Sequence, residues 1–92
     1  MREREIEEYL RKQVKAVGGI AYKWTSPGNA GVPDRIVVLP GGHVYFTELK
    51  APGGKPTPLQ LLQHRKLSTL GCEVKVISSK EQVDAFIQGV QS

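Results

Sequence analysis

Residues 31–50 read GVPDRIVVLPGGHVYFTELK, and this stretch predicts the centre of the fold. Residues 35–39 are largely apolar and β-branched, residues 40–42 are Pro-Gly-Gly, and residues 44–49 return as a second run with strand propensity. Two such runs joined by a short glycine-containing turn are typical of a β-hairpin. The sequence therefore predicts two neighbouring antiparallel strands here.

Three charged residues lie where the strands of this hairpin would meet. Asp34 enters the first strand, and Glu48 and Lys50 close the second. Side chains two apart on a strand share a face, so Glu48 and Lys50 point the same way and Leu49 points to the other side. In a register whose paired numbers sum to an even value, Asp34 faces Glu48 or Lys50 at roughly 5 Å. Two carboxylates at that distance can share a divalent metal, and a nearby lysine can hold a water or neutralise a phosphate.

Pro33-Asp34 followed by Glu48-Leu49-Lys50 resembles the PD-(D/E)xK nuclease motif. The surrounding residues 31–35 and the later Gln60 resemble the virus-type replication–repair nuclease (VRR-NUC) branch in its small stand-alone form. The ExK element alone is a weak signal, but the ordered set is much more specific. The resemblance extends over nearly the whole chain.

The composition suits one soluble globular domain spanning residues 1–92. The hydrophobic content is 39%, which is sufficient for one compact core in a chain of this length. No apolar run approaches the roughly 20 residues of a membrane span, and the N-terminus is charged, unlike a signal peptide. We therefore expect a cytoplasmic protein, from a bacterium or from a phage in its host. The net charge of +4 favours a polyanionic partner.

Hydrophobic periodicity and capping residues predict seven elements in the order α-β-β-β-α-β-α. A helix between the third and fourth strands permits a right-handed crossover. We therefore expect an α/β (α+β) fold, a restriction-endonuclease-like core with a four-stranded mixed sheet flanked by helices. The predicted elements are a helix over residues 3–17, strands over 20–24, 35–39 and 44–49, a helix over 58–70, a strand over 72–77 and a last helix after residue 78.

The two later helices begin with capping patterns. Thr57 stands at an N-cap with Pro58 at the first helical position and Gln60 where a capping box requires Glu or Gln. Ser78 and Glu81 predict a second capping box. We expect the buried side of the helix over residues 58–70 to consist of its leucines Leu59, Leu62, Leu67 and Leu70.

Glu7 lies on the shoulder of the buried face of the first helix. Four glutamates there suit the positive end of the helix dipole, so a solvated helix face explains all of them. The resemblance implies more, because metal-dependent nucleases of this group carry a first-helix glutamate as an additional metal ligand. Counted back from Gly18, Glu7 matches that position best, with Glu3 as the reserve.

The resemblance also implies contacts with water and with DNA. It makes Gln60 a catalytic residue that orients the attacking water or contacts the phosphate, alongside its capping role. It places the loop over residues 26–31 beside the scissile phosphate. The residues expected to bind nucleic acid are Lys23, Ser26, Asn29, Arg35, Lys55 and Arg65, although each also has a simple explanation as a loop or surface residue.

The sequence lacks the residues that a nucleotide-binding P-loop or a zinc site requires. Gly54-Lys55 fails as a P-loop because Leu49 replaces the first glycine and Pro56 replaces the Ser/Thr, so no nucleotide cofactor is expected. Cys72 is the one cysteine and the chain has two histidines, which leaves no disulfide and too few ligands for zinc.

The residues and the resemblance together predict a metal-dependent, structure-specific DNA endonuclease. Asp34 and Glu48 would hold Mg²⁺ or Mn²⁺, with the Leu49 carbonyl as a further ligand and Glu7 on the outer side. Lys50 would orient water, accept a proton or offset negative charge. No base-reading motif is present, so phosphate contacts and DNA shape would dominate binding. The resemblance implies branched DNA, notably four-way junctions, and a homodimer that supplies two cuts.

Two alternatives remain at this point. One is a non-catalytic nucleic-acid-binding module that retains the nuclease fold. The other is a partner-binding protein whose charged hairpin residues form only a surface ion pair.

Overall fold

The structure, a computed structural model, describes residues 1–91. Its seven elements confirm the predicted order, and their ends differ from the predicted ends by at most two residues. None of the helices in this range combines the length and apolar character that crossing a membrane requires. The elements are α1 (Glu3–Ala16), β1 (Ile20–Lys23), β2 (Arg35–Leu39), β3 (His43–Leu49), α2 (Pro58–Thr69), β4 (Val74–Ile77) and α3 (Lys80–Gln91).

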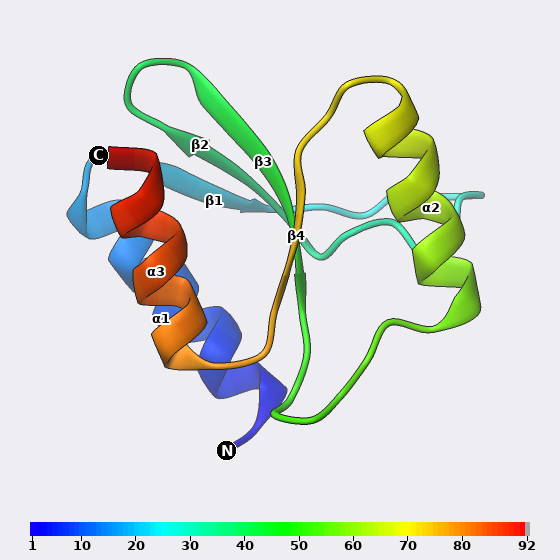
Figure 1. Cartoon of the computed structure of the whole chain (residues 1–92), viewed down its shortest axis with the longest axis horizontal. Coiled ribbons are helices and arrows are strands. Elements are labelled where there is room, and N and C mark those ends of the chain that lie inside the picture. Colours follow the sequence, from blue (N-terminus) through cyan, green and yellow to red (C-terminus); the bar gives the residue numbers. More distant parts are fainter. Residues whose placement is uncertain (92) are drawn as a thin grey trace.

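The four strands form one mixed sheet in the order β1-β2-β3-β4. The first three strands are antiparallel neighbours, and β4 runs parallel to β3 after the crossover through α2. Figure 1 shows α1 and α3 together on one side of the sheet and α2 on the other, beside β4. The mixed four-stranded sheet flanked by helices is therefore confirmed.

The side covered by α1 and α3, here called the closed face, contains the hydrophobic core. Ile6, Leu10 and Val14 form a stripe along α1, and each is fully buried. Tyr45 of β3 meets Phe86 of α3 edge to face, with ring centroids 5.0 Å apart. Burial of this stripe is what holds α1 on the sheet. The strand and α3 residues that complete the core are Ala21, Val37, Leu39, Leu49, Ile77, Val83 and Ile87.

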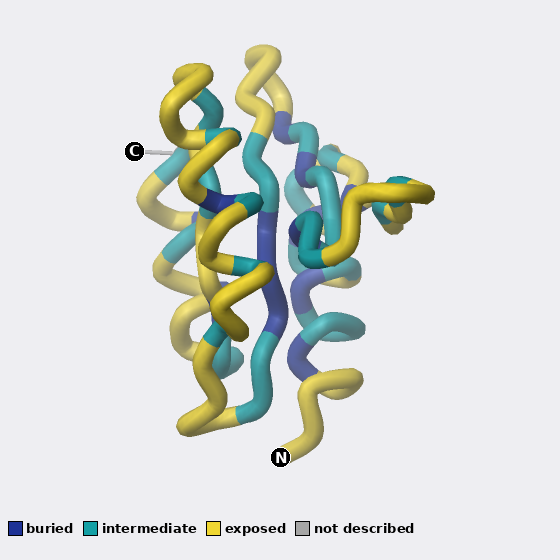
Figure 2. Tube along the Cα trace, turned by 90° about the vertical axis from the view of Figure 1, so that its right-hand side faces the viewer, coloured by how far each residue is buried: buried dark blue, intermediate teal, exposed yellow. Residues whose placement is uncertain are grey.

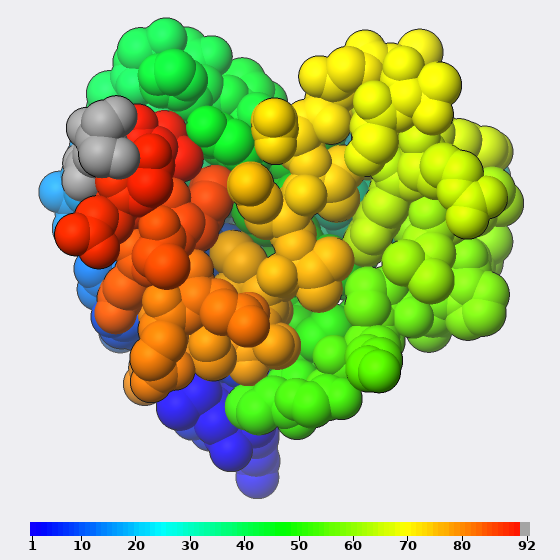
Figure 3. All heavy atoms as spheres, in the orientation of Figure 1, coloured from blue at the N-terminus to red at the C-terminus, as the bar shows by residue number. Residues whose placement is uncertain are grey.

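The opposite side of the sheet, here called the open face, is apolar but much less covered. The strand registers align its residues into rows across the sheet, and Val44, Tyr22 and Val76 are 46%, 55% and 43% exposed. Figure 3 shows a notch in the surface between the tip of the β2–β3 hairpin and the end of α2. We define the open face by the residues Ile20, Tyr22, Ile36, Val38, Val44, Phe46, Val74 and Val76.

Helix α2 begins as predicted but turns a different side inward. Thr57 is the N-cap and forms the complete capping box with Gln60. The prediction that four leucines form its buried side is wrong, because none of them is buried. Leu59, Leu62 and Leu70 are 48%, 42% and 81% exposed. Figure 2 shows α2 largely as exposed chain. Among the described residues of α2, His64 is the one that is buried.

The capping pair of α3 lies one residue later than predicted. The helix begins at Lys80, so Ser79 is the N-cap, and its Oγ accepts the N–H of Gln82 at 3.1 Å. The Gln82 side chain in turn accepts the N–H of Ser78 at 2.7 Å. The predicted Ser78–Glu81 capping box is therefore wrong: the N-cap lies one residue later, and the Gln82 side chain bonds the N–H of the residue before it.

Candidate active site

Asp34 and Glu48 lie side by side at the end of the open face. Arg35 pairs with Thr47 in the β2–β3 ladder, and one step further along this register Asp34 stands opposite Glu48. The two carboxyl groups are close enough to hydrogen-bond. The backbone N–H of Leu49 donates to Oδ2 of Asp34 at 2.8 Å, which holds the Asp34 side chain beside β3. The convergence expected from the hairpin geometry is therefore present.

Glu48 is a buried acid beside a second acid, so its ionised form is unfavourable. Its side chain is 1% exposed. Burial, then the hydrogen bond and the negative charge of Asp34, raise the pKa of Glu48 to about 8, while Lys50 acts in the opposite direction and Glu3 adds a smaller increase. In a carboxyl pair of this kind, one group keeps its proton unless a cation offsets the second negative charge. The site therefore has the electrostatics of a cation-binding centre.

Lys50 stands next to this pair. Its Nζ is 4.0 Å from Oε2 of Glu48, and its side chain is 16% exposed. Glu48 belongs to β3 and Lys50 directly follows the strand, and the contact between them shows that their side chains lie on the same side, as predicted. An ammonium group here can offset negative charge that builds up beside the carboxylates.

Two side chains of helix α2 contact the carboxyl group of Glu48. Nε2 of Gln60 donates to Oε2 of Glu48 at 3.1 Å, and Nε2 of His64 lies 3.2 Å from Oε1. Burial, and then the charge of Lys50, lower the pKa of His64, which favours the neutral ring. Sequence reasoning missed His64. The signal was its position four residues after Gln60, which places both side chains on one helix face.

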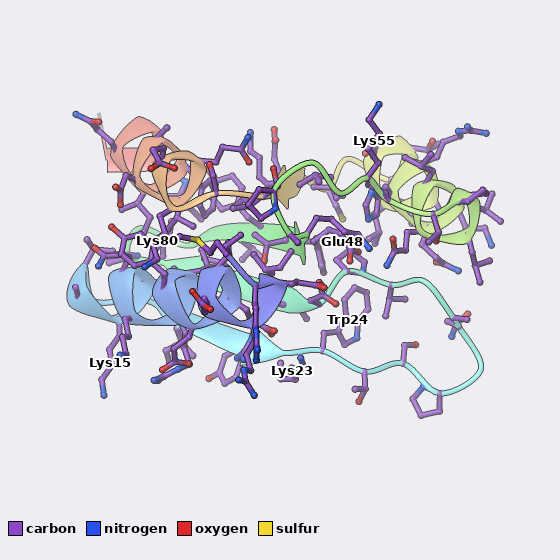
Figure 4. All side chains as sticks on the ribbon, turned by 90° about the horizontal axis from the view of Figure 1, so that it is seen from below. Lys15, Lys23, Trp24, Glu48, Lys55 and Lys80 are labelled. Carbon is purple, nitrogen blue, oxygen red and sulfur yellow. The ribbon has the colours of Figure 1, made fainter. Side chains whose placement is uncertain are left out.

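The chain between β1 and β2 packs against the start of α2. Gly31 has a φ of +91°, and a Cβ there would lie 2.8 Å from the carbonyl oxygen of Leu59, so a larger residue would push the two segments apart. Figure 4 shows Glu48 between α2 on one side and this loop on the other. The glycine of the GVPD stretch thus allows the loop and helix to enclose the acidic pair.

Glu7 has different partners from those predicted. Its Oε2 accepts from Nε of Arg35 at 2.7 Å and from Nζ of Lys23 at 3.0 Å, while Nη1 of Arg35 donates to the carbonyl of Ala21 at 2.9 Å. Partial burial raises the pKa of Glu7, but these bonds outweigh it and leave the pKa below its usual value. Arg35 shares its strand face with Val37 of the core, whereas Asp34 points to the open face. The structure therefore does not bring Glu7 to Asp34 and Glu48.

The acidic pair fits Mg²⁺ better than a metal that needs a full protein cage. Within residues 1–91, no group of three or more His, Cys, Asp or Glu side chains is arranged to hold a metal ion. Mg²⁺ is commonly held by one or two carboxylates and keeps several waters, which is what Asp34, Glu48 and the Leu49 carbonyl could offer. The buried Glu48 carboxyl opposite Asp34 is the observation that supports this fit.

The residues predicted to bind nucleic acid are spread over several places. Asn29 and Ser26 bond to each other in a turn of the exposed loop, at 3.0 Å through the backbone and 3.1 Å through the side chains. Lys55 points away from Glu48 in Figure 4, and Arg65 lies on the exposed surface of α2. Trp24, at the start of the loop, packs on Phe46 with ring centroids 5.2 Å apart.

We compared the chain with known proteins and solved structures. No model of a protein family matches the chain. The chain is 53% identical over 81 residues to "Putative nuclease p44" of Acyrthosiphon pisum secondary endosymbiont phage 1, covering 88% of this chain and 87% of that protein. A solved structure described as "VRR_NUC domain" superposes with a TM-score of 0.87 at 36% identity over 94% of both chains. A second, described as "VRR_NUC domain protein", shares the fold with a TM-score of 0.74 at 20% identity, over 96% of this chain and 86% of that one. The chain therefore belongs to the VRR-NUC family.

Proposed function

We propose that this protein is a metal-dependent, structure-specific endonuclease that hydrolyses phosphodiester bonds in branched DNA such as four-way junctions. The observation that carries the proposal is the buried Glu48 beside Asp34, with the Nζ of Lys50 4.0 Å away. Two acids and an amine in this arrangement suit phosphoryl-group chemistry. Kinship with a phage protein named as a nuclease supports the same reaction class.

Asp34, Glu48 and the carbonyl of Leu49 would hold Mg²⁺ or Mn²⁺. When bound, the metal would polarise the phosphate and lower the pKa of a water. An acid from the first helix would lie on the outer side of the centre. Glu7 would have to exchange Arg35 and Lys23 for the metal, whereas Glu3 already acts on Glu48 by raising its pKa. The proposal therefore prefers Glu3 to Glu7 in this outer role.

Lys50 and Gln60 would act on the water and the phosphate. Lys50 would orient the water and offset the negative charge that develops on the phosphate. The Gln60 side chain accepts the N–H of Thr57 at 2.9 Å and donates one amide N–H to Glu48. An amide nitrogen carries two N–H groups, so the second can donate to the attacking water or to a phosphate oxygen. Gln60 would thus combine its capping role with a role at the reaction centre.

DNA would be held mainly through its phosphates. Ser26 and Asn29 present polar groups on the loop beside the site, and Lys55 and Arg65 add positive charge on the α2 side. Lys23, Arg35 and Glu7 together leave a net charge of +1 near the loop, and the Lys23 side chain is 60% exposed. Contacts of this kind recognise the backbone and the shape of DNA rather than base sequence.

Cleavage of labelled oligonucleotides tests the proposal against a non-catalytic binding module. The substrates are a four-way junction, a fork, a flap and a linear duplex, each incubated with Mg²⁺ or with EDTA. We expect Mg²⁺-dependent cuts in branched substrates and none in EDTA. Tight junction binding without cleavage in either Mg²⁺ or Mn²⁺ would identify a binding module. Equal cutting of duplex and junction would reject the structure specificity.

A homodimer would match the two-fold symmetry of a four-way junction, which needs two cuts. The open face is the surface that supports this part of the proposal, because its apolar residues are left half-exposed by α2. Light scattering should give the mass of two chains for the wild type and of one chain for Val44→Glu. Lys12→Glu, on the exposed side of α1, is the control and should remain dimeric. A monomeric wild type at tens of micromolar would contradict the dimer.

A further inference from the structure

His64 is a buried polar residue on a helix where no leucine is buried. Its exposed fraction is 8%, whereas Leu61 and Leu62 on the same helix are 48% and 42% exposed. Burying a polar ring is unfavourable unless its nitrogen finds a partner. The partner is Glu48, whose Oε1 lies 3.2 Å from Nε2 of His64. Side-chain burial on α2 is therefore directed at one carboxylate and not at a hydrophobic core.

One turn earlier on α2, Gln60 contacts the other oxygen of the same group. Nε2 of Gln60 donates to Oε2 of Glu48 at 3.1 Å, so the two oxygens of Glu48 each have a partner on one rigid helix. The capping box fixes the start of that helix, and the Gln60 side chain takes part both in this box and in the contact with Glu48. The position of Glu48 is thus defined from outside its own strand.

We propose that His64 is a positioning residue that holds the Glu48 carboxylate in its metal-binding orientation through an Nε2–H···Oε1 hydrogen bond. The inference rests on the proposed function, because it assigns a role toward the metal that Asp34 and Glu48 would share. A metal-bound carboxylate is an acceptor, so the neutral ring must carry its proton on Nε2. Gln60 fixes the second oxygen, and the pair together restrict rotation of the carboxylate. Hydrogen bonds that orient a ligand in this way strengthen metal binding.

The test is titration of metal-free protein with Mn²⁺ alone, followed by electron paramagnetic resonance of the free ion. His64→Leu removes the donor. His64→Gln places an amide nitrogen at about the reach of Nε2, whereas His64→Asn places it at about the reach of Nδ1. We expect Mn²⁺ affinity to fall about 10–100-fold in His64→Leu and His64→Asn and to stay within a few-fold of wild type in His64→Gln. His43→Leu, at the exposed hairpin, is the matched control and should bind as the wild type does.

Each outcome separates the roles. Wild-type affinity in His64→Leu would overturn the inference, and so would equal losses in His64→Gln and His64→Asn, because the hydrogen bond would then not be what matters. Thermal melting shows which variants fold; if His64→Leu does not, the two amide variants still decide. If Asp34→Asn abolishes strong Mn²⁺ binding but no His64 variant changes it, the metal centre stands and only the role of His64 is rejected. Absence of Mn²⁺ binding by the wild type would instead overturn the proposed metal centre and this inference with it.

Discussion

Helices α1 and α2 pack on opposite sides of the same sheet and use their inward positions for different purposes. The inward stripe of α1 is Ile6, Leu10 and Val14, all fully buried against the closed face. The inward side of α2 presents Gln60 and His64 to a single carboxylate, and its leucines Leu59, Leu61 and Leu62 are exposed. One helix therefore seals a hydrophobic core, and the other supports a polar site.

This difference suggests that stability and chemistry are separated across the sheet. Changes under α1 should unfold the protein without altering what the folded fraction can do. Changes around Glu48 should alter the chemistry and leave the core intact, because the core residues lie on the closed face. The four predictions below test that separation, from the largest expected effect to the smallest.

Asp34→Asn and Glu48→Gln should lower the cutting rate by about a thousandfold or more, since each removes a charge on which the proposed metal centre depends. Junction affinity, measured by gel shift in Ca²⁺, should stay within a few-fold of wild type. Circular dichroism melting should show an intact fold in both variants. Normal cutting by either one would end the assignment of the acidic pair as the reaction centre.

Leu10→Ala should reduce the free energy of unfolding by about 2–5 kcal/mol, because it leaves a cavity in the closed face. The matched change on the other helix, Leu61→Ala, should cost less than about 1 kcal/mol, because Leu61 is 48% exposed. Urea denaturation of both variants measures the difference. Equal losses would show that α2 contributes to the core as α1 does, and the contrast between the two helices would not hold.

Lys50→Ala should lower the turnover number by about a hundredfold while changing junction affinity little, because its charge acts beside the carboxylates. Lys55→Ala, on the exposed loop, is the contrast and should weaken binding and reduce its salt dependence with little effect on turnover. Single-turnover kinetics separate the two effects. An unchanged turnover number in Lys50→Ala would remove Lys50 from the mechanism.

Metal-free wild-type protein should lose about 2 kcal/mol of stability as the pH rises from 6.5 to 8. The folded-state pKa of Glu48 is raised to about 8, above its ordinary value of 4.5, so the stability that its proton contributes is fully present below pH 4.5 and is lost as the pH rises from there through 8. The pKa of Glu7 is lowered from 4.5, so its contribution changes at lower pH, outside this window. The pKa of His64 is lowered from 6.5, so its contribution rises through pH 6.5 and opposes only the beginning of the loss.

Thermal melting in EDTA across this pH range measures the loss. Glu48→Gln has no proton to release and should show little change between the same pH values. A wild-type curve as flat as that of the variant would mean that Glu48 is ionised at neutral pH without a metal, contrary to its burial beside Asp34.

Much of the fold could be predicted from the sequence because its signals are local. The alternation around a Pro-Gly-Gly turn predicted the hairpin, and Thr57 with Gln60 predicted the start of α2. The same local reasoning failed where several partners compete. Leucines recur around α2 at positions compatible with a buried stripe, but α2 lies beside the acidic end of the open face, and Gln60 and His64 turn inward to contact Glu48 there.

The candidate site divides in the same way. Asp34, Glu48 and Lys50 could be predicted because two strands of one hairpin bring them together, and strand alternation determines the face on which each side chain lies. Glu7 was assigned from its position along α1, but its neighbours come from β1 and β2, and two cations there hold its carboxylate. His64 carried no local signal stronger than its spacing from Gln60.

The sequence by itself determined the elements, the hairpin, the acidic pair and the amine beside it, because hydrogen bonding and side-chain alternation act over a few residues. Only the tertiary structure decided which helix face turns inward, which cations hold Glu7, and which groups hold Glu48. These choices depend on the charge and burial that distant segments create for one another once they pack.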